Sequence, residues 1–467
     1  MTVEPRLPAW WLEQALAAEG NLPPAPALAA DATADVAIVG GGYTGLWTAL
    51  ALRERAPDLQ VTLLEAEICG HGPSGRNGGF VHGYWASLAS ILPVLGEERA
   101  LELARSGERI IPGIRAWAES RGEDVWLREA GMLEVSAAPA QDSAVEKAAA
   151  AAAGVGHADQ AVALTPDEVA RRVSSPVFRG GVFFPECATV HPGLLVRGLR
   201  RAALDAGVTL HEETPVTAVR AGELETQGGI LRAPEIVLAT NAALTGWSPA
   251  SRNLTNFGSY IVLTEPAPEL LAEIGWTGGE AIVDGRMFLH YFRTTNDGRV
   301  LMGSGSGPIG FGGRIDDRFS RDAPTSARAE AGLRRLLPGL ARVRVERAWG
   351  GPIDVSADHL PFFRTKPRTR IHFGAGYSGH GVGPAWLGGQ ILASLALGAD
   401  DEWTRSPLAT RNMPRLPPEP LRRTGGGLVR WAIMACEAAE EEGRRPPLAA
   451  RAGAALPRLL GLELGTR

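Results

Sequence analysis

Three glycines near the N-terminus have the spacing of a turn that binds nucleotide phosphates. Gly40, Gly42 and Gly45 follow the apolar run at 36–39 and fit the pattern G-x-G-x-x-G. In that pattern the first glycine permits a tight turn, the second lets a pyrophosphate approach the backbone, and the third lets the next helix pack against the strand. Glu65 follows a second apolar run about 20 residues after Gly45, where a carboxylate accepts hydrogen bonds from a ribose. Strand, turn, helix, strand and acid together predict a dinucleotide site.

A second glycine set, Gly374, Gly376 and Gly379, matches the same pattern. A second nucleotide such as NADPH therefore has to be considered. No strand with an acidic end follows, because the helix expected at 385–397 runs directly into the C-terminal tail. We favour the alternative, in which this turn directs backbone N–H groups and a helix dipole at a flavin ring and stabilises its anionic reduced form.

The hydrophobic pattern of the remaining chain predicts an α/β fold. A Rossmann-type cofactor domain is expected to be interleaved with an α+β substrate domain built on an antiparallel sheet. Apolar runs at 208–211 and 235–239 add strands to the first domain, and 256–343 alternates as short strands with a hairpin turn at 296–298. The expected segments are an arm at 1–34, cofactor-domain segments at 35–90, 178–250 and 344–400, substrate-domain segments at 91–177 and 251–343, and a Pro- and Arg-rich helical tail at 401–467. Further helices are expected at 10–18, 97–118, 141–153, 325–336 and 428–441. Another helix is expected to begin at Pro192, and a strand is expected at 130–137.

The composition excludes several classes of protein. The net charge of −5 argues against a nucleic-acid partner, and no apolar run is long enough to suggest a membrane span. The three cysteines are far apart, which predicts neither a disulfide framework nor a metal cluster. The N-terminus lacks the basic start and apolar centre of a signal peptide, so a cytoplasmic location is expected. Self-association of the chain is left open.

Six blocks in a fixed order give the chain a family resemblance. They are DVAIVGGGYTGL, GPSGRNGG, HPGLLVRGL, PEIVLATNA, AWGGPIDVSADHLPF and GAGYSGHGV. The chain resembles the D-amino-acid oxidase/glycine oxidase/sarcosine oxidase superfamily of FAD enzymes, most closely its γ-glutamylputrescine oxidase-like members. The resemblance implies that FAD is held by residues of four segments: Gly40, Gly42, Tyr43, Thr44, Gly45 and Glu65; Ser74, Arg76, Asn77, Gly78 and Gly79; Val216 and Thr240; and Gly376, Tyr377, Ser378, Gly379, His380, Gly381 and Val382.

The resemblance also implies a reaction. A hydride passes from the carbon beside a neutral amine nitrogen to flavin N5, and water hydrolyses the resulting imine. His380, His290 and Tyr291 are the candidates for contact with flavin or substrate, and His82 is a weaker one. The expected partners are a small amine and either O2 or another electron acceptor.

Three departures from the family pattern narrow this expectation. Sarcosine oxidase-like relatives bind a substrate carboxylate with two basic residues, but the corresponding positions here are Val81 and Gly383, which favours an amine or polyamine-like substrate. Neither Lys147 nor Lys366 is placed to speed a reaction with O2. Gly351 stands near the position at which some relatives attach the flavin to a cysteine, which predicts non-covalent FAD. The alternatives are a flavin monooxygenase or tailoring enzyme reduced by NAD(P)H, a glycine- or sarcosine-type oxidase, and a flavoprotein scaffold whose tail binds a partner.

Overall fold

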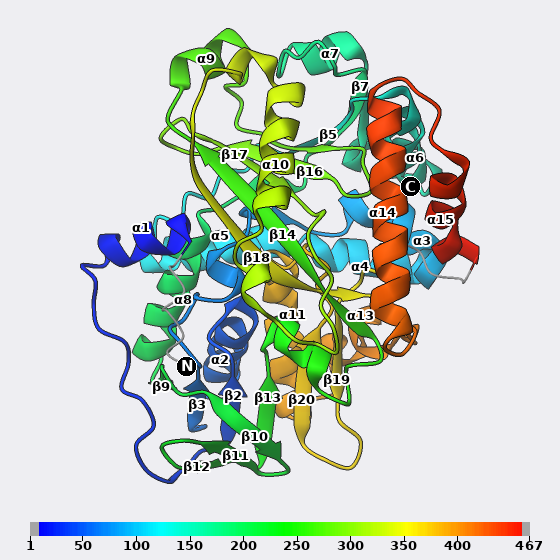
Figure 1. Ribbon diagram of the computed structural model, residues 1–467. Coiled ribbons are helices and arrows are strands. Elements are labelled where there is room, and N and C mark those ends of the chain that lie inside the picture. The colour runs from blue at the N-terminus through cyan, green and yellow to red at the C-terminus, as the bar shows by residue number, and fades with distance from the viewer. Residues whose placement is uncertain (1–8, 460–467) are drawn as a thin grey trace.

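One lobe of the protein is built on a six-stranded sheet in the computed structural model, which describes residues 9–459 (Figure 1). All pairs run parallel except the edge pair β19–β20. Every residue of β2, β3 and β13 is buried, as expected of apolar strands covered on both faces. The strand order is β19 (Phe362–Thr365), β20 (Ile371–Ala375), β13 (Glu235–Leu238), β2 (Val36–Val39), β3 (Val61–Leu64) and β9 (Thr209–His211).

Three helices pack beside this sheet. Helix α2 (Tyr43–Arg55) follows the first glycine turn and packs against both α8 (Pro192–Asp205) and α11 (Pro384–Ala396). No strand follows α11 in the part of the chain that the structure describes, so the second glycine set does not open a complete strand–helix–strand unit.

The other lobe is built on an eight-stranded sheet. The hairpin predicted at 296–298 joins β16 to β17, but the pair β5–β15 runs parallel, so the sheet is mixed. Helix α10 (Ala323–Leu336) packs against this sheet. The strand order is β18 (Val345–Ser356), β14 (Leu254–Thr264), β17 (Val300–Ser304), β16 (His290–Thr294), β15 (Ala281–Asp284), β5 (Met132–Ser136), β7 (Gly180–Phe184) and β6 (Val162–Leu164).

Strand pairing corrects two of the expected domain boundaries. Strand β7 lies in the segment expected to join the cofactor domain at residue 178, yet it pairs with β5 and β6. Strand β18 lies in the segment expected to return at residue 344, yet it pairs along its length with β14. Both strands therefore belong to the eight-stranded sheet, and the chain returns to the cofactor lobe only after each of them ends.

The remaining elements are short. The helix expected at 97–118 is divided into α4 (Glu97–Gly107) and α5 (Ile110–Arg121). A four-stranded sheet contains β1 (Ala32–Thr33), β12 (Ile230–Arg232), β11 (Glu223–Thr226) and β10 (Val216–Arg220), and β4 (Phe80–His82) pairs with β8 (Cys187–Thr189). The other helices are α3 (Leu88–Leu95), α6 (Asp142–Gly154), α7 (Pro166–Ala170), α9 (Pro268–Glu273), α12 (Glu402–Arg405) and α13 (Pro407–Thr410).

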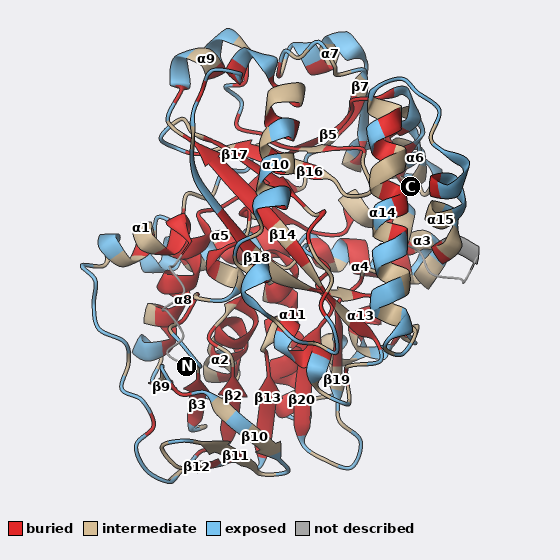
Figure 2. Ribbon diagram, in the orientation of Figure 1, coloured by how far each residue is buried: buried red, intermediate tan, exposed pale blue. Residues whose placement is uncertain are grey.

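The arm and the tail both pack on the two lobes. Helix α1 (Trp10–Ala18) has the predicted bounds, and its fully buried Trp11 packs in an apolar cluster with Trp349. In the tail, α14 (Leu421–Glu441) and α15 (Leu448–Leu459) pack against each other, and α14 shows a buried stripe along one side (Figure 2). Residues 1–8 and 460–467 of the expected arm and tail lie outside the described residues. None of the described helices combines the length and the apolar content needed to cross a membrane.

Candidate cofactor site and substrate cavity

The first glycine turn lies at the carboxyl ends of β2 and β13. Gly40 has φ +112°, and a Cβ atom there would lie 2.6 Å from the backbone oxygen of Ala239. A Cβ atom on Gly45 would overlap the Gly40 carbonyl oxygen, so the helix start requires glycine. The methyl group of Thr240 is next to Gly40, which brings the two predicted cofactor segments together. The N–H groups of the first turn of α2 have no partners within the helix and face this edge of the sheet.

Glu65 closes the same edge from the end of β3. Its carboxylate accepts hydrogen bonds from the backbone N–H of Gly41 (2.6 Å) and of Glu67 (3.0 Å). Burial raises the pKa of Glu65. Val216 begins β10, two residues after Thr214, whose N–H donates to the Glu65 carbonyl oxygen (2.8 Å). Glu65 and Val216, which were both predicted to hold FAD, therefore lie on neighbouring segments.

The second glycine-rich loop is held to the first by side-chain hydrogen bonds. Ser74 Oγ accepts a hydrogen bond from the N–H of Tyr43 (2.9 Å). Asn77 Nδ2 donates to the Ser74 carbonyl (2.9 Å), while its Oδ1 accepts from the N–H of Gly79 (2.7 Å). Arg76 is buried, and its carbonyl accepts from Trp349 Nε1 (2.8 Å). These contacts fix the loop along one side of a cavity.

The last glycine block is joined to the rest of the site by Asp354, which the sequence reasoning missed. The Asp354 carboxylate accepts hydrogen bonds from the Gly376 N–H and from Asn241 Nδ2 (2.9 Å). Burial raises the pKa of Asp354 to about 7. Thr44 at the start of α2 is hydrogen-bonded to the Tyr377 hydroxyl (2.7 Å). No sequence pattern marks Asp354, because its partners come from two segments that are distant in the sequence.

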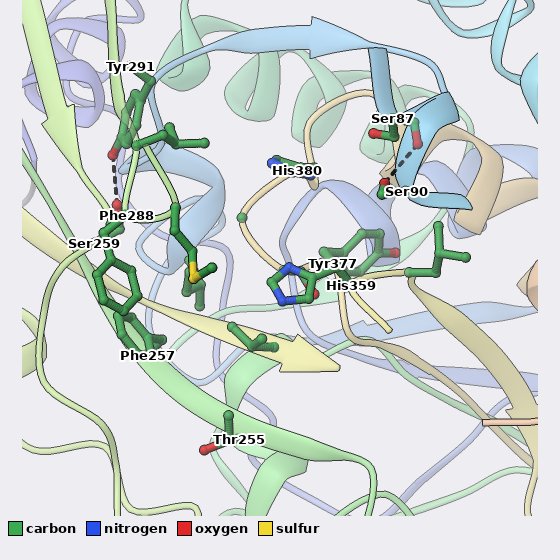
Figure 3. A pocket seen from close by; sticks show the side chains of 18 of the residues that line it. Ser87, Ser90, Thr255, Phe257, Ser259, Phe288, Tyr291, His359, Tyr377 and His380 are labelled. Carbon is green, nitrogen blue, oxygen red and sulfur yellow. Dashed lines mark hydrogen bonds between the residues drawn. The ribbon is translucent and has the colours of Figure 1, made fainter. Parts of the chain in front are cut away.

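A cavity of about 750 Å³ lies between the two lobes, in the size range of ligand sites. The glycine loop contributes Asn77 to Gly79, and the last glycine block contributes Tyr377 to His380 and Val382. The eight-stranded sheet contributes apolar and hydroxyl side chains, several of which are drawn in Figure 3. The sheet residues that line it include Met132, Glu134, Thr255, Phe257, Ser259, Ile261, Val283, Asp284 and Tyr291.

Two of the three predicted catalytic candidates face this cavity. The Tyr291 hydroxyl is hydrogen-bonded to Ser259 Oγ (2.8 Å), as Figure 3 shows, and burial raises the pKa of Tyr291 to about 12. A Cβ atom on Gly78 would lie 3.0 Å from the Tyr291 ring, so this ring packs on the glycine loop. His380 also lines the cavity, and its ring centroid lies 5.3 Å from that of His82. The ring is exposed, and the surrounding chain, with the neighbouring His82 and His359, lowers the pKa of His380.

The third candidate, His290, is placed elsewhere, and its assignment is corrected. Side chains alternate along β16, so His290 points to the face opposite Tyr291. Its Nδ1 is hydrogen-bonded to Asp284 Oδ2 (2.8 Å), and it lines a smaller pocket beneath α14. His290 therefore does not face the main cavity. No sequence pattern marks His359, which lines the main cavity with φ +57° and whose Nε2 has no hydrogen-bond partner among the described residues.

The cradle of glycines and N–H groups, the acid at the end of β3 and the cavity beyond them fit a flavin dinucleotide. The match to the model of the family "DAO: FAD dependent oxidoreductase" covers residues 35–395. The chain belongs to this family. The protein is therefore an FAD-dependent oxidoreductase.

Relatives support the same assignment. A probable oxidoreductase OrdL of Rhizobium meliloti (strain 1021) is 31% identical over 81% of this chain and 86% of its own length. The gamma-glutamylputrescine oxidoreductase of Escherichia coli (strain K12) is 29% identical over 82% of this chain and 88% of its own length. The crystal structure of glycine oxidase from Geobacillus kaustophilus superposes with a TM-score of 0.68 at 22% identity, covering 82% of this chain and all of that one. This last likeness concerns the fold.

The tail of this DAO-family protein lies beyond the matched residues and yet lines the cavity. Helix α14 contributes Gly425, Gly426, Val429 and Arg430, and α15 contributes Leu456 and Pro457. Arg430 Nε donates to the Ser306 carbonyl oxygen (3.0 Å), which attaches α14 to the segment that follows β17. The tail therefore forms one wall of the site, a role that its composition did not predict.

Gly383 and Val81 stand at the two positions that correspond to the carboxylate-binding residues of relatives, and neither position suits a basic side chain that reaches the cavity. A Cβ atom on Gly383 would lie 2.5 Å from the His82 carbonyl oxygen, so a larger residue is excluded without a backbone shift. Val81 is fully buried in the core and does not line the cavity. Neither Lys147 nor Lys366 lines it.

Proposed function

We propose that the protein oxidises a C–N bond of a polyamine-like or secondary amine to an imine, which water hydrolyses. The observation that carries this proposal is the close packing of Gly383 against the backbone of His82. A basic side chain cannot occupy that position without a backbone shift, so one half of the family's carboxylate clamp is missing. Bound FAD supplies the hydride acceptor, and the chain supplies position, exclusion of water and charge.

Side chains of the cavity have defined tasks in this proposal. Tyr291 and Phe80 pack edge to face, with centroids 5.7 Å apart, and form an apolar wall against the glycine loop. This wall excludes water from the bond that is oxidised. His380, with its lowered pKa, is neutral at pH 7 and can hold the water that later attacks the imine.

A second candidate is an amino-acid substrate, because Arg430 lines the cavity and could approach a carboxylate. Against it, the Nε and Nη2 atoms of Arg430 already donate to the Ser306 carbonyl oxygen (3.0 and 2.5 Å). Arg422, which also lines the cavity, donates to the carbonyl oxygens of Pro417, Ser251 and Leu254. Arg430 and Arg422 are therefore already hydrogen-bonded within the protein, which favours an amine substrate over an amino acid.

Anaerobic reduction of the purified holoenzyme tests the proposal. Alkyl amines and diamines should bleach the flavin absorbance, whereas glycine and sarcosine should do so more slowly or not at all. Faster bleaching by glycine or sarcosine would establish the amino-acid alternative. Bleaching by NADPH without any amine would instead favour the monooxygenase alternative.

A further inference from the structure

One carboxylate of the substrate cavity has no cationic partner among the residues that the structure describes. Within residues 9–459, three acidic side chains line the cavity. Asp358 is paired with Arg411 (2.9 Å), and Asp284 is hydrogen-bonded to His290. Glu134 is 8% exposed, and among the described residues no hydrogen bond or ion pair reaches its carboxylate. A buried carboxylate without a partner is costly unless a ligand supplies the missing charge.

The strand register shows which way Glu134 faces. In the eight-stranded sheet Glu134 of β5 is paired with Val283 of β15, and Val283 is paired with Tyr291 of β16. Paired residues point to the same face of a sheet. All three line the cavity, so they form one row across its wall. Tyr291 lies against Gly78 at the end of the row next to the glycine loop, and Glu134 lies two strands away, or about 10 Å.

The side chains between the two ends are apolar. Val283 and Met132 line the cavity next to Glu134, and Ile261 lines it on the far side of Tyr291. This arrangement suits a ligand with an alkyl chain between two polar ends. Burial and the nearby Asp284 carboxylate raise the pKa of Glu134 to about 7, so an ammonium ion beside it would favour its ionised form.

We infer that Glu134 binds the second, non-reacting ammonium group of a diamine or polyamine whose reacting nitrogen lies near Tyr291. This inference rests on the proposed function and specifies its substrate class. Glu134 is thus a specificity-determining residue, because it distinguishes a diamine from a monoamine of the same length. An ion pair with hydrogen bonds in a buried site corresponds to a preference of about tenfold or more.

Binding to the oxidised holoenzyme tests the inference separately from turnover. Dissociation constants are measured by calorimetry and by the flavin spectrum for α,ω-diamines of three to six methylenes and for the n-alkylamines of matching length. The wild type should bind the best diamine about tenfold or more tightly than its monoamine partner. Glu134→Gln should abolish that difference while leaving monoamine affinity unchanged. Glu186→Gln is the matched control, because the Glu186 carboxylate oxygens are also buried but Glu186 does not line the cavity.

Each outcome has a distinct meaning. Equal affinity for diamines and monoamines in the wild type, or an unchanged preference in Glu134→Gln, would overturn the inference. Loss of the preference in Glu134→Gln with retention in Glu186→Gln would support it. Thermal melting of both variants shows whether they are folded. If diamines bind through Glu134 but never reduce the flavin, the proposed oxidation is wrong and the ammonium site stands.

Discussion

The unpaired Glu134 carboxylate should make the stability of the protein depend on pH in a way that one substitution removes. The pKa of Glu134 is raised from 4.5 to about 7 in the folded protein, chiefly by burial. Between these two values the folded state binds more protons than the unfolded state, so the free energy of unfolding falls as pH rises. The contribution is complete below about pH 4.5 and is lost by about pH 7. The shift corresponds to about 3 kcal/mol.

Glu134→Gln removes the titrating proton and keeps the shape of the side chain. At pH 5 the variant and the wild type should melt at similar temperatures. At pH 8 the wild type holds a buried charge, and the variant should be more stable by up to about 3 kcal/mol. A chain of this length has an unfolding entropy of about 1 kcal/mol per degree, so the difference in Tm should grow by about 3 °C between the two pH values.

Differential scanning fluorimetry of the two holoenzymes, without amine and in the same buffers, measures this difference. A melting-temperature gap that is the same at pH 5 and pH 8 would refute the reasoning, because Glu134 would then titrate normally in the fold. Glu186→Gln offers a comparison, since burial also raises the pKa of Glu186, to about 8. The difference in Tm between Glu186→Gln and the wild type should therefore still increase with pH above the pH at which the difference for Glu134→Gln has become constant. Saturating diamine should reduce the Glu134→Gln gap at pH 8, because the ligand binds the wild type more tightly and therefore stabilises it more than the variant.

Four further outcomes are expected. Gly45→Ala should yield colourless protein that does not take up added FAD, since its Cβ would overlap a backbone oxygen of the turn, and a yellow variant would contradict this. Glu212→Gln should reduce the free energy of unfolding by about 3 to 5 kcal/mol and lower Tm by several degrees, because Arg197 and Arg200 would lose the buried carboxylate that they share. An unchanged Tm would contradict the pairing. Gly425→Leu should keep or raise Tm, since it removes a helix glycine, yet weaken binding of bulky amines, because Gly425 lines the cavity with open space beside it; unchanged affinity would mean that α14 is not a wall of the site. Acid precipitation of the holoenzyme should release all flavin into the supernatant, and colour in the pellet would show a covalent bond.

The cofactor half of the fold could be predicted because its signals are local. The turn at Gly40 and Gly45, the two apolar strands and the acid at Glu65 all lie within one short stretch, and each has a physical reason that can be stated without knowing the fold. Strand bounds for 36–39 and 61–64 agree with the structure, as does the helix at 10–18. The domain edges at 178 and 344 were wrong, because a strand's apolar pattern does not reveal which sheet it joins.

The substrate half was harder to predict, since its site is made of pairings between distant segments. Tyr291 and His290 are adjacent in sequence, and only the register of β16 shows that one faces the cavity and the other the opposite pocket. Glu134 lies in a strand that was predicted, but nothing local marks its carboxylate as unpaired. Asp354 was missed for the same reason, because it binds backbone and side-chain groups from separate blocks.

The wall formed by α14 bears on how far substrate identity can be carried over from relatives. The family match ends at residue 395, whereas α14 begins at Leu421 and contributes Gly425 and Arg430 to the cavity. The glycine turns and the acid that are predicted to hold FAD all lie inside the matched region, and the cofactor follows from membership of the family. One wall of the substrate cavity lies outside it, and the charge opposite the glycine loop depends on a single strand residue, Glu134. The substrate therefore has to be argued from this chain's own cavity, where an unpaired carboxylate and the closed position at Gly383 both favour a cation over an amino acid.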